Sequence, residues 1–178
     1  MATTNNFVFK ALTIIAWIIF VGLCIEAGGL IVNFIFSLYK PEFVQNLYQK
    51  LDLSKMYEQS KWAFYSMYSF ILVLAIMKAV LFYVVIILIT KIDLSKPFNS
   101  FVSRQISLIS YYTLSIGLLS FIARQSAKNL LHHGFVTESL KQFWEDSEAF
   151  ILMAAIIYII ATIFKKGIEL QNENDLTV

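Results

Sequence analysis

The fold is decided by residues 62–90, which read WAFYSMYSFILVLAIMKAVLFYVVIILIT. This run contains one charged side chain, Lys78, and lies between Lys61 and Lys91. About 20 helical residues cross the hydrocarbon core of a bilayer, which is roughly 30 Å thick, so the run is long enough to span it. The apolar residues do not alternate with polar ones, as they would in a barrel strand. A continuous run must be helical, because every backbone group needs a partner inside lipid.

Three further apolar runs have the same character, at about residues 11–39, 106–123 and 147–164. The first is nearly twice as long as the 7–15 residues of a signal-peptide core, so we expect it to be retained. The last ends at Lys165 and Lys166, whose long stems can reach the interface. The sequence predicts an all-α integral membrane protein with a four-transmembrane-helix bundle. We expect one membrane domain over residues 1–178, with a polar tail at 165–178.

The composition excludes several other classes of protein. Hydrophobic residues make up 58% of the chain and charged residues only 15%, so too little polar material remains to cover a soluble globule. The net charge of +2 is too small for a surface that binds nucleic acid directly. The single cysteine, Cys24, cannot form an intrachain disulfide.

The two segments on the side away from the termini have amphipathic patterns. In the first, apolar side chains recur at helical spacing, at Phe43, Val44, Leu47, Tyr48 and Leu51. The second, residues 124–148, combines apolar residues such as Trp144 with four acidic ones. We expect short amphipathic helices that lie on the bilayer surface in both loops.

Orientation depends on the distribution of Lys and Arg outside the spans. Four spans place both termini on one side, where the tails and the middle loop hold six basic residues, against seven in the longer outer loops. Basic residues favour the cytoplasmic side, and the difference in density is small. We expect both termini in the cytoplasm.

Glu26 and Lys78 are charged residues near the middle of two apolar runs. An isolated charge at the bilayer centre costs about 2.5–3.5 kcal/mol, and such residues usually pair or line a cavity. We hypothesise an ion pair between them. The pair would either fix the register of the two helices or form a ligand, ion or proton site, and the sequence leaves both open.

Small and polar residues form a stripe on two of the predicted helices. They are Gly22, Gly29 and Asn33 on the first, and Ser107, Ser110 and Gly117 on the third. Such stripes usually mark contacts between helices in membranes, because close backbone approach supplies the attraction there. We expect both to face the bundle interior for packing, with a polar cavity between them as the alternative.

No catalytic or metal-binding pattern is present in the sequence. His132 and His133 are adjacent, so on a helix they point about 100° apart and do not share a metal easily. Zinc-ligand spacings, paired carboxylates and phosphate-binding loops are also lacking. We expect a protein that is not an enzyme and that needs no metal or cofactor.

Two segments resemble a known family. Residues 163–178 read IFKKGIELQNENDLTV, and residues 93–98 read DLSKPF. The first resembles the terminal signature, and the second the Pro-Phe step of the middle loop, in a bacterial four-span family known as domain of unknown function 2975. The resemblance implies an inner-membrane protein, often encoded beside a small helix-turn-helix regulator, and hence a membrane partner for a cytoplasmic transcription factor.

The resulting functional expectation is a membrane sensor or a sequestering partner of that regulator. Its binding residues would lie in the tail, at Glu169, Gln171, Glu173, Asn174, Asp175, Leu176 and Val178. The alternative is a small transporter, channel or immunity-type protein with a polar path at Glu26 and Lys78. Its four helices would enclose such a path only narrowly, so a homo-oligomer would help.

Overall fold

The computed structural model describes residues 2–40, 42, 44, 47–48, 51–93 and 97–175, with side chains from Phe7 to Glu173. Its elements in chain order are α1 (Ala2–Tyr39), α2 (Ser54–Gln59), α3 (Lys61–Lys91), α4 (Ser100–His132), the 3₁₀ helix η3 (Glu138–Phe143) and α5 (Ser147–Asp175). The described residues contain no named strand. Four stretches, built on α1, α3, α4 and α5, are long and apolar enough to cross a membrane. The predicted all-α, four-helix architecture is confirmed, and it indicates a multi-pass membrane protein.

Local signals explain where the long helices begin and end. The Ser60 hydroxyl accepts a hydrogen bond from the Ala63 N–H at the start of α3, and the Asn99 side chain accepts one from the Val102 N–H at the start of α4. These caps satisfy backbone donors that have no partner within the helix. After α4 the chain turns at Gly134, whose φ of 84° is a conformation that glycine adopts without strain.

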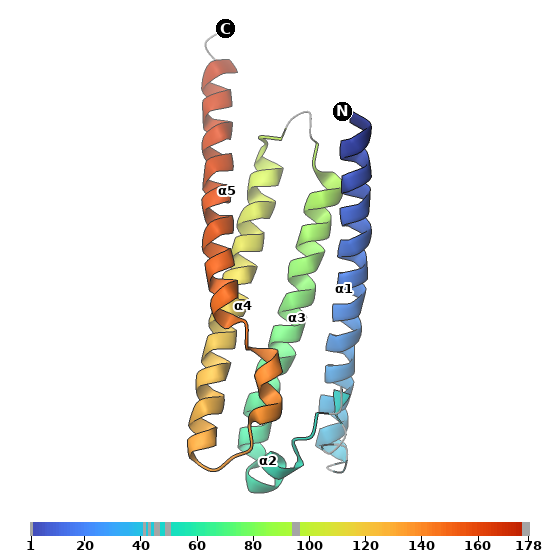
Figure 1. Cartoon of the computed structure of the whole chain (residues 1–178), viewed down its shortest axis with the longest axis vertical. Helices are drawn as coiled ribbons and strands as arrows, with labels where there is room; N and C mark the ends of the chain where they lie inside the picture. Colours follow the sequence, from blue (N-terminus) through green and yellow to red (C-terminus); the bar gives the residue numbers. More distant parts are fainter. Residues whose placement is uncertain are drawn as a thin grey trace.

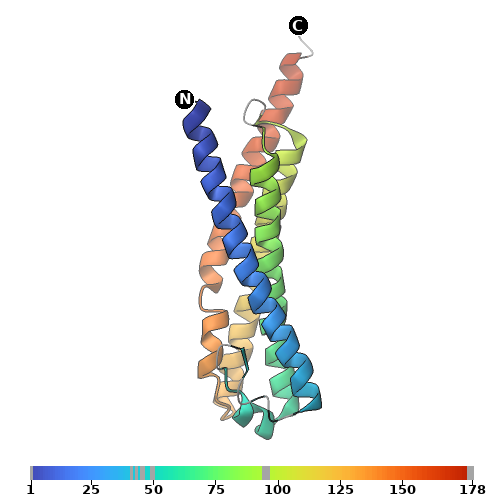
Figure 2. The same ribbon diagram turned by 90° about the vertical axis from the view of Figure 1, so that its right-hand side faces the viewer.

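The long helices pack in the order of the sequence, with α1 against α3, α3 against α4, and α4 against α5 (Figure 1). The contact between α4 and α5 is the most extensive. The N-terminal half of α1 leans away from its neighbours (Figure 2). Both chain termini lie at one end of the bundle, which we call the terminal end, whereas α2 and η3 lie at the other, the loop end.

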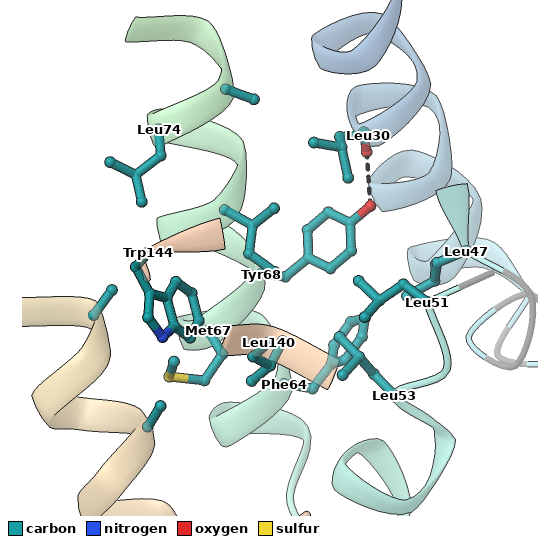
Figure 3. Packing of buried hydrophobic residues seen from close by; sticks show 14 of the residues in the cluster. Leu30, Leu47, Leu51, Leu53, Phe64, Met67, Tyr68, Leu74, Leu140 and Trp144 are labelled. Atoms are coloured by element: carbon teal, nitrogen blue, oxygen red, sulfur yellow. Dashed lines mark hydrogen bonds between the residues drawn. The ribbon is translucent and has the colours of Figure 1, made fainter. Parts of the chain in front are cut away.

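The main hydrophobic core lies at the loop end (Figure 3). Leu30 of α1 and Phe64, Tyr68 and Ile71 of α3 are completely buried there. The Tyr68 hydroxyl donates a hydrogen bond of 3.0 Å to the Leu30 carbonyl, so the polar end of this buried ring has a partner. Since several chain segments meet around these side chains, the loop end resembles the interior of a soluble protein.

The loops at this end differ from the surface helices that the sequence led us to expect. Short helices do occur in both, but Val44, Leu47 and Leu51 are buried in the core, as are Leu140 and Trp144. Phe43 lies outside the described residues. Protein side chains of the core therefore cover these apolar side chains of the loops.

Candidate functional site

Glu26 and Lys78 do not form the predicted ion pair. Both side chains are partly exposed. Within the described residues the ion pairs are Arg124–Glu148, Lys141–Glu138 and Lys166–Glu169. The charge on α1 and the charge on α3 therefore have separate surroundings.

The reason lies in the face that α3 turns toward α1. A groove between the two helices is lined by Cys24, Ala27 and Gly28 from α1, and by Ile76, Ala79 and Val80 among others from α3. Residues two positions apart on a helix point about 200° apart, so Lys78 lies on nearly the opposite face from Ile76 and Val80. Sequence position indicated similar depth for the two charges, but depth does not determine the direction in which each side chain points.

Lys78 instead lines a small polar cavity where η3 passes into α5. The cavity has a volume of about 20 Å³ and is lined by Lys78, Ser120, Gln142, Phe143, Trp144, Glu145, Asp146, Ser147 and Phe150. Ser120 and Ser147 are buried, and the two carboxylates on the turn are exposed. This volume is large enough for about one water molecule, which would find several polar partners there. The charge within α3 therefore borders polar groups of α4 and of the turn before α5.

The polar stripe of α1 does not meet a polar partner along its length. Gly22 is exposed, and a Cβ there would have nothing within 4 Å. At Gly29 a Cβ would lie 2.6 Å from Cδ2 of Tyr48, so this glycine admits the aromatic ring of the following loop. Asn33 is partly exposed. Only the part of the stripe nearer the loop end has a packing role.

The polar stripe of α4 forms the contact with α5. The Ser110 hydroxyl donates a hydrogen bond of 3.0 Å to the Ala154 carbonyl, and a Cβ at Gly117 would lie 2.7 Å from Cγ1 of Ile151. The Ser107 hydroxyl donates to the Ser103 carbonyl within its own helix. The α4 stripe thus packs on α5, whereas Gly29 of the α1 stripe packs on Tyr48 of the first loop, so the two stripes contact different elements.

The two segments that carry the family resemblance meet at the terminal end. The ring of Phe98, from the middle loop, packs on Phe164 of α5 with 5.2 Å between the ring centroids. A Cβ at Gly167 would lie 2.7 Å from Cδ1 of Phe98, so the ring sits against the backbone of α5. Sequence reasoning missed this contact. A lone glycine between Lys166 and Ile168 in a helix is the signal that could have indicated it.

Beyond this contact α5 continues as a helix to Asp175 and extends past the neighbouring helices (Figure 1). Lys166 and Glu169 form an ion pair of 2.7 Å on its surface, and Gln171 and Glu173 are exposed. Asn174 and Asp175 are described as helix without their side chains, and Leu176 and Val178 lie outside the described residues.

The apolar side chain of Leu170 is 59% exposed on the same extension. A single exposed leucine is ordinary on a protein surface, so Leu170 by itself does not mark an interface. The described part of the chain contains no group of three or more His, Cys, Asp or Glu side chains that could hold a metal ion.

Comparison with known protein families identifies a match over most of the chain. The family model described as "Protein of unknown function (DUF2975)" matches residues 46–178, about three quarters of the chain. The match includes both the middle loop and the extension of α5. No curated protein and no solved structure matches the chain.

Proposed function

We propose that this chain, which belongs to the DUF2975 family of proteins of unknown function, holds a cytoplasmic protein at the membrane through the extension of α5. The small helix-turn-helix regulator implied by the family resemblance is the first partner to test. The observation that carries the proposal is the helical extension itself, which continues to Asp175 and is packed at its base against Phe98. In this proposal the protein acts by binding and performs no catalysis.

A helix that is already formed is a good binding element. Association costs free energy for each segment that must become ordered, and an existing helix avoids part of that cost. The extension offers Leu170 as an apolar anchor, with the Lys166–Glu169 ion pair and the carboxylate of Glu173 beside it. Such a helix fits an apolar groove bordered by basic residues on the partner.

The contact of Phe98 with Gly167 would transmit a signal from the membrane to this helix. Since α5 packs on α4 over most of its length, a change in the α4–α5 packing would move the extension relative to the middle loop. A ligand can produce such a change only if it binds one packing more strongly than the other. This sensing role therefore predicts that partner binding and signal binding influence each other.

The test measures binding of the purified regulator to the full chain in nanodiscs. We expect Leu170→Glu to weaken binding at least tenfold, because it removes the apolar anchor. The control variant is Leu152→Ala, at an exposed leucine in the membrane-spanning part of α5, where a glutamate would itself be destabilising. This variant should bind the regulator as tightly as the unchanged protein does. Equal binding by Leu170→Glu, or binding that survives removal of residues 168–178, would contradict the proposal.

The transport alternative has less support from the geometry. It requires Glu26 and Lys78 to line one path, whereas Glu26 lies outside the cavity of about 20 Å³ that Lys78 lines. An ion flux in proteoliposomes that Glu26→Gln reduces, and that loss of the tail leaves intact, would favour transport over the binding role.

A further inference from the structure

A cleft at the loop end lies between the last turns of α4 and the segment around η3. Its volume is about 370 Å³, and its lining consists of Arg124, Ala127, Lys128, Leu131, Thr137, Lys141, Trp144 and Glu145. Pockets for small ligands generally measure about 300–1,000 Å³. The cleft is thus large enough for the polar head of a lipid and the first carbons below it.

The charges of α4 place this cleft at the level of lipid head groups. Residues 105–123 contain no charged side chain, and as a helix they measure about 28 Å, close to the thickness of the hydrocarbon core. Arg104 and Arg124, which bound this stretch, then lie at the two interfaces. The ion pair of 2.6 Å between Arg124 and Glu148 joins α4 to the start of α5 at the same level.

Two of the cations at the cleft are already neutralised. Arg124 is paired with Glu148, and Lys141 is paired with Glu138 at 2.8 Å. Lys128 and Glu145 are both exposed, and in the part of the chain that the structure describes neither takes part in an ion pair. The cleft therefore offers the cation of Lys128 and the carboxylate of Glu145, which also borders the cavity that Lys78 lines.

The base of the cleft is apolar. Trp144 and Ala127 are buried, and Leu131 is half-exposed beside them. A ligand with a charged head and an apolar body matches this arrangement.

We propose that the cleft binds the phosphoethanolamine head group of a phospholipid. Lys128 binds the phosphate, with Arg124 beside it, and Glu145 accepts a hydrogen bond from the primary ammonium group. An anionic lipid without an amine would leave Glu145 next to a negative charge. Phosphatidylcholine would satisfy Lys128, but its quaternary ammonium has no N–H to donate to the carboxylate.

The test measures lipid retention by the full chain with native mass spectrometry, using phosphatidylethanolamine, phosphatidylcholine and phosphatidylglycerol with identical acyl chains. We expect about fivefold greater occupancy by phosphatidylethanolamine than by the other two. Glu145→Gln should reduce the preference over phosphatidylcholine to about one, and Lys128→Gln should lower occupancy by phosphatidylethanolamine and phosphatidylcholine together. The control variant is Lys55→Gln on α2. The side chains of Glu145, Lys128 and Lys55 are all exposed, and thermal melting checks that each variant is folded.

Three results would overturn the proposal. The first is tighter retention of phosphatidylglycerol than of phosphatidylethanolamine. The second is an unchanged preference in Glu145→Gln, which would mean that the carboxylate does not recognise the amine. The third is displacement of the lipid by an equal concentration of soluble O-phosphoethanolamine, because the ligand would then be the free head group and not a membrane lipid.

Discussion

The two ends of this bundle are stabilised in different ways. At the loop end Leu30, Phe64 and Tyr68 are fully enclosed by several chain segments. Toward the terminal end the large apolar side chains of α1 point outward, with Phe7 74% exposed and Ile18 67% exposed. The difference reflects two solvents. Water drives burial at the loop end, whereas lipid gives no hydrophobic reason for helices to associate, so close approach at small residues must hold them together there.

The largest expected effect breaks the enclosed core. Phe64→Ala should destabilise the protein by about 3–5 kcal/mol, because it removes a completely buried ring from a site that other segments close. The matched control, Ile18→Ala, removes apolar surface that already contacts lipid and should cost under about 0.5 kcal/mol. Thermal unfolding in detergent measures both. Similar losses for the two variants would remove the distinction between the ends.

A pair of glycines tests how the helices associate within the membrane. Gly117→Ala should cost about 1–3 kcal/mol, because the new Cβ would lie 2.7 Å from Cγ1 of Ile151 and 3.0 Å from its backbone nitrogen. Gly22→Ala meets nothing within 4 Å and should be neutral or stabilising, since alanine favours a helix more than glycine does. Unfolding of both variants in the same detergent gives the comparison. A neutral Gly117→Ala would show that α4 and α5 do not depend on close packing.

A smaller effect concerns a buried hydrogen bond that joins α3 to α1 at the loop end. Tyr68→Phe keeps the ring and removes the hydroxyl donor, while the Leu30 carbonyl still accepts the N–H of Phe34 within α1, so the expected loss is the net value of one hydrogen bond, about 0.5–1.5 kcal/mol. Tyr158→Phe, in an exposed position on α5, is the control and should change stability little. Equal melting temperatures of the two variants would show that this hydrogen bond adds nothing to the packing of α3 on α1.

The smallest effect is a dependence on pH. Asp52 accepts hydrogen bonds from the Ser54 hydroxyl at 2.7 Å and the Ser54 N–H at 2.9 Å, and these bonds lower the pKa of its carboxyl group. Stability from this group is therefore present above its ordinary pKa, about 3.9, and is lost as the pH falls through the lowered value. Because the side chain is exposed, we expect about 0.5 kcal/mol or less. Asp52→Asn should remove this part of the acid sensitivity in unfolding measured from pH 5 downward.

The sequence predicted the four helices because length and continuous apolarity suffice for that conclusion. It did not predict which face of each helix meets which neighbour. Lys78 illustrates the difference, since its position in the run of 62–90 indicates depth, while its cavity is made by α4 and by the turn before α5. For a related reason, the sequence did not show what covers the apolar side chains of the loops. An apolar stripe such as Val44, Leu47 and Leu51 has the same spacing whether lipid or protein covers it.

The contact between Phe98 and Gly167 was beyond sequence reasoning for a third reason. The residues are far apart in the chain, and each belongs to a segment that resembles the family on its own. Only the packing of α5 beside the middle loop brings them together.

The packing of each long helix on the one before it also has a consequence for biosynthesis. Helices emerge from the ribosome in the same order, so α3 finds α1 already in the bilayer, and α4 then finds α3. No helix has to wait for a partner that has not yet been synthesised. The last helix, α5, makes the most extensive contact of the set. Assembly of these long helices can thus be completed as α5 leaves the insertion machinery, when the extension proposed to bind a partner first becomes available.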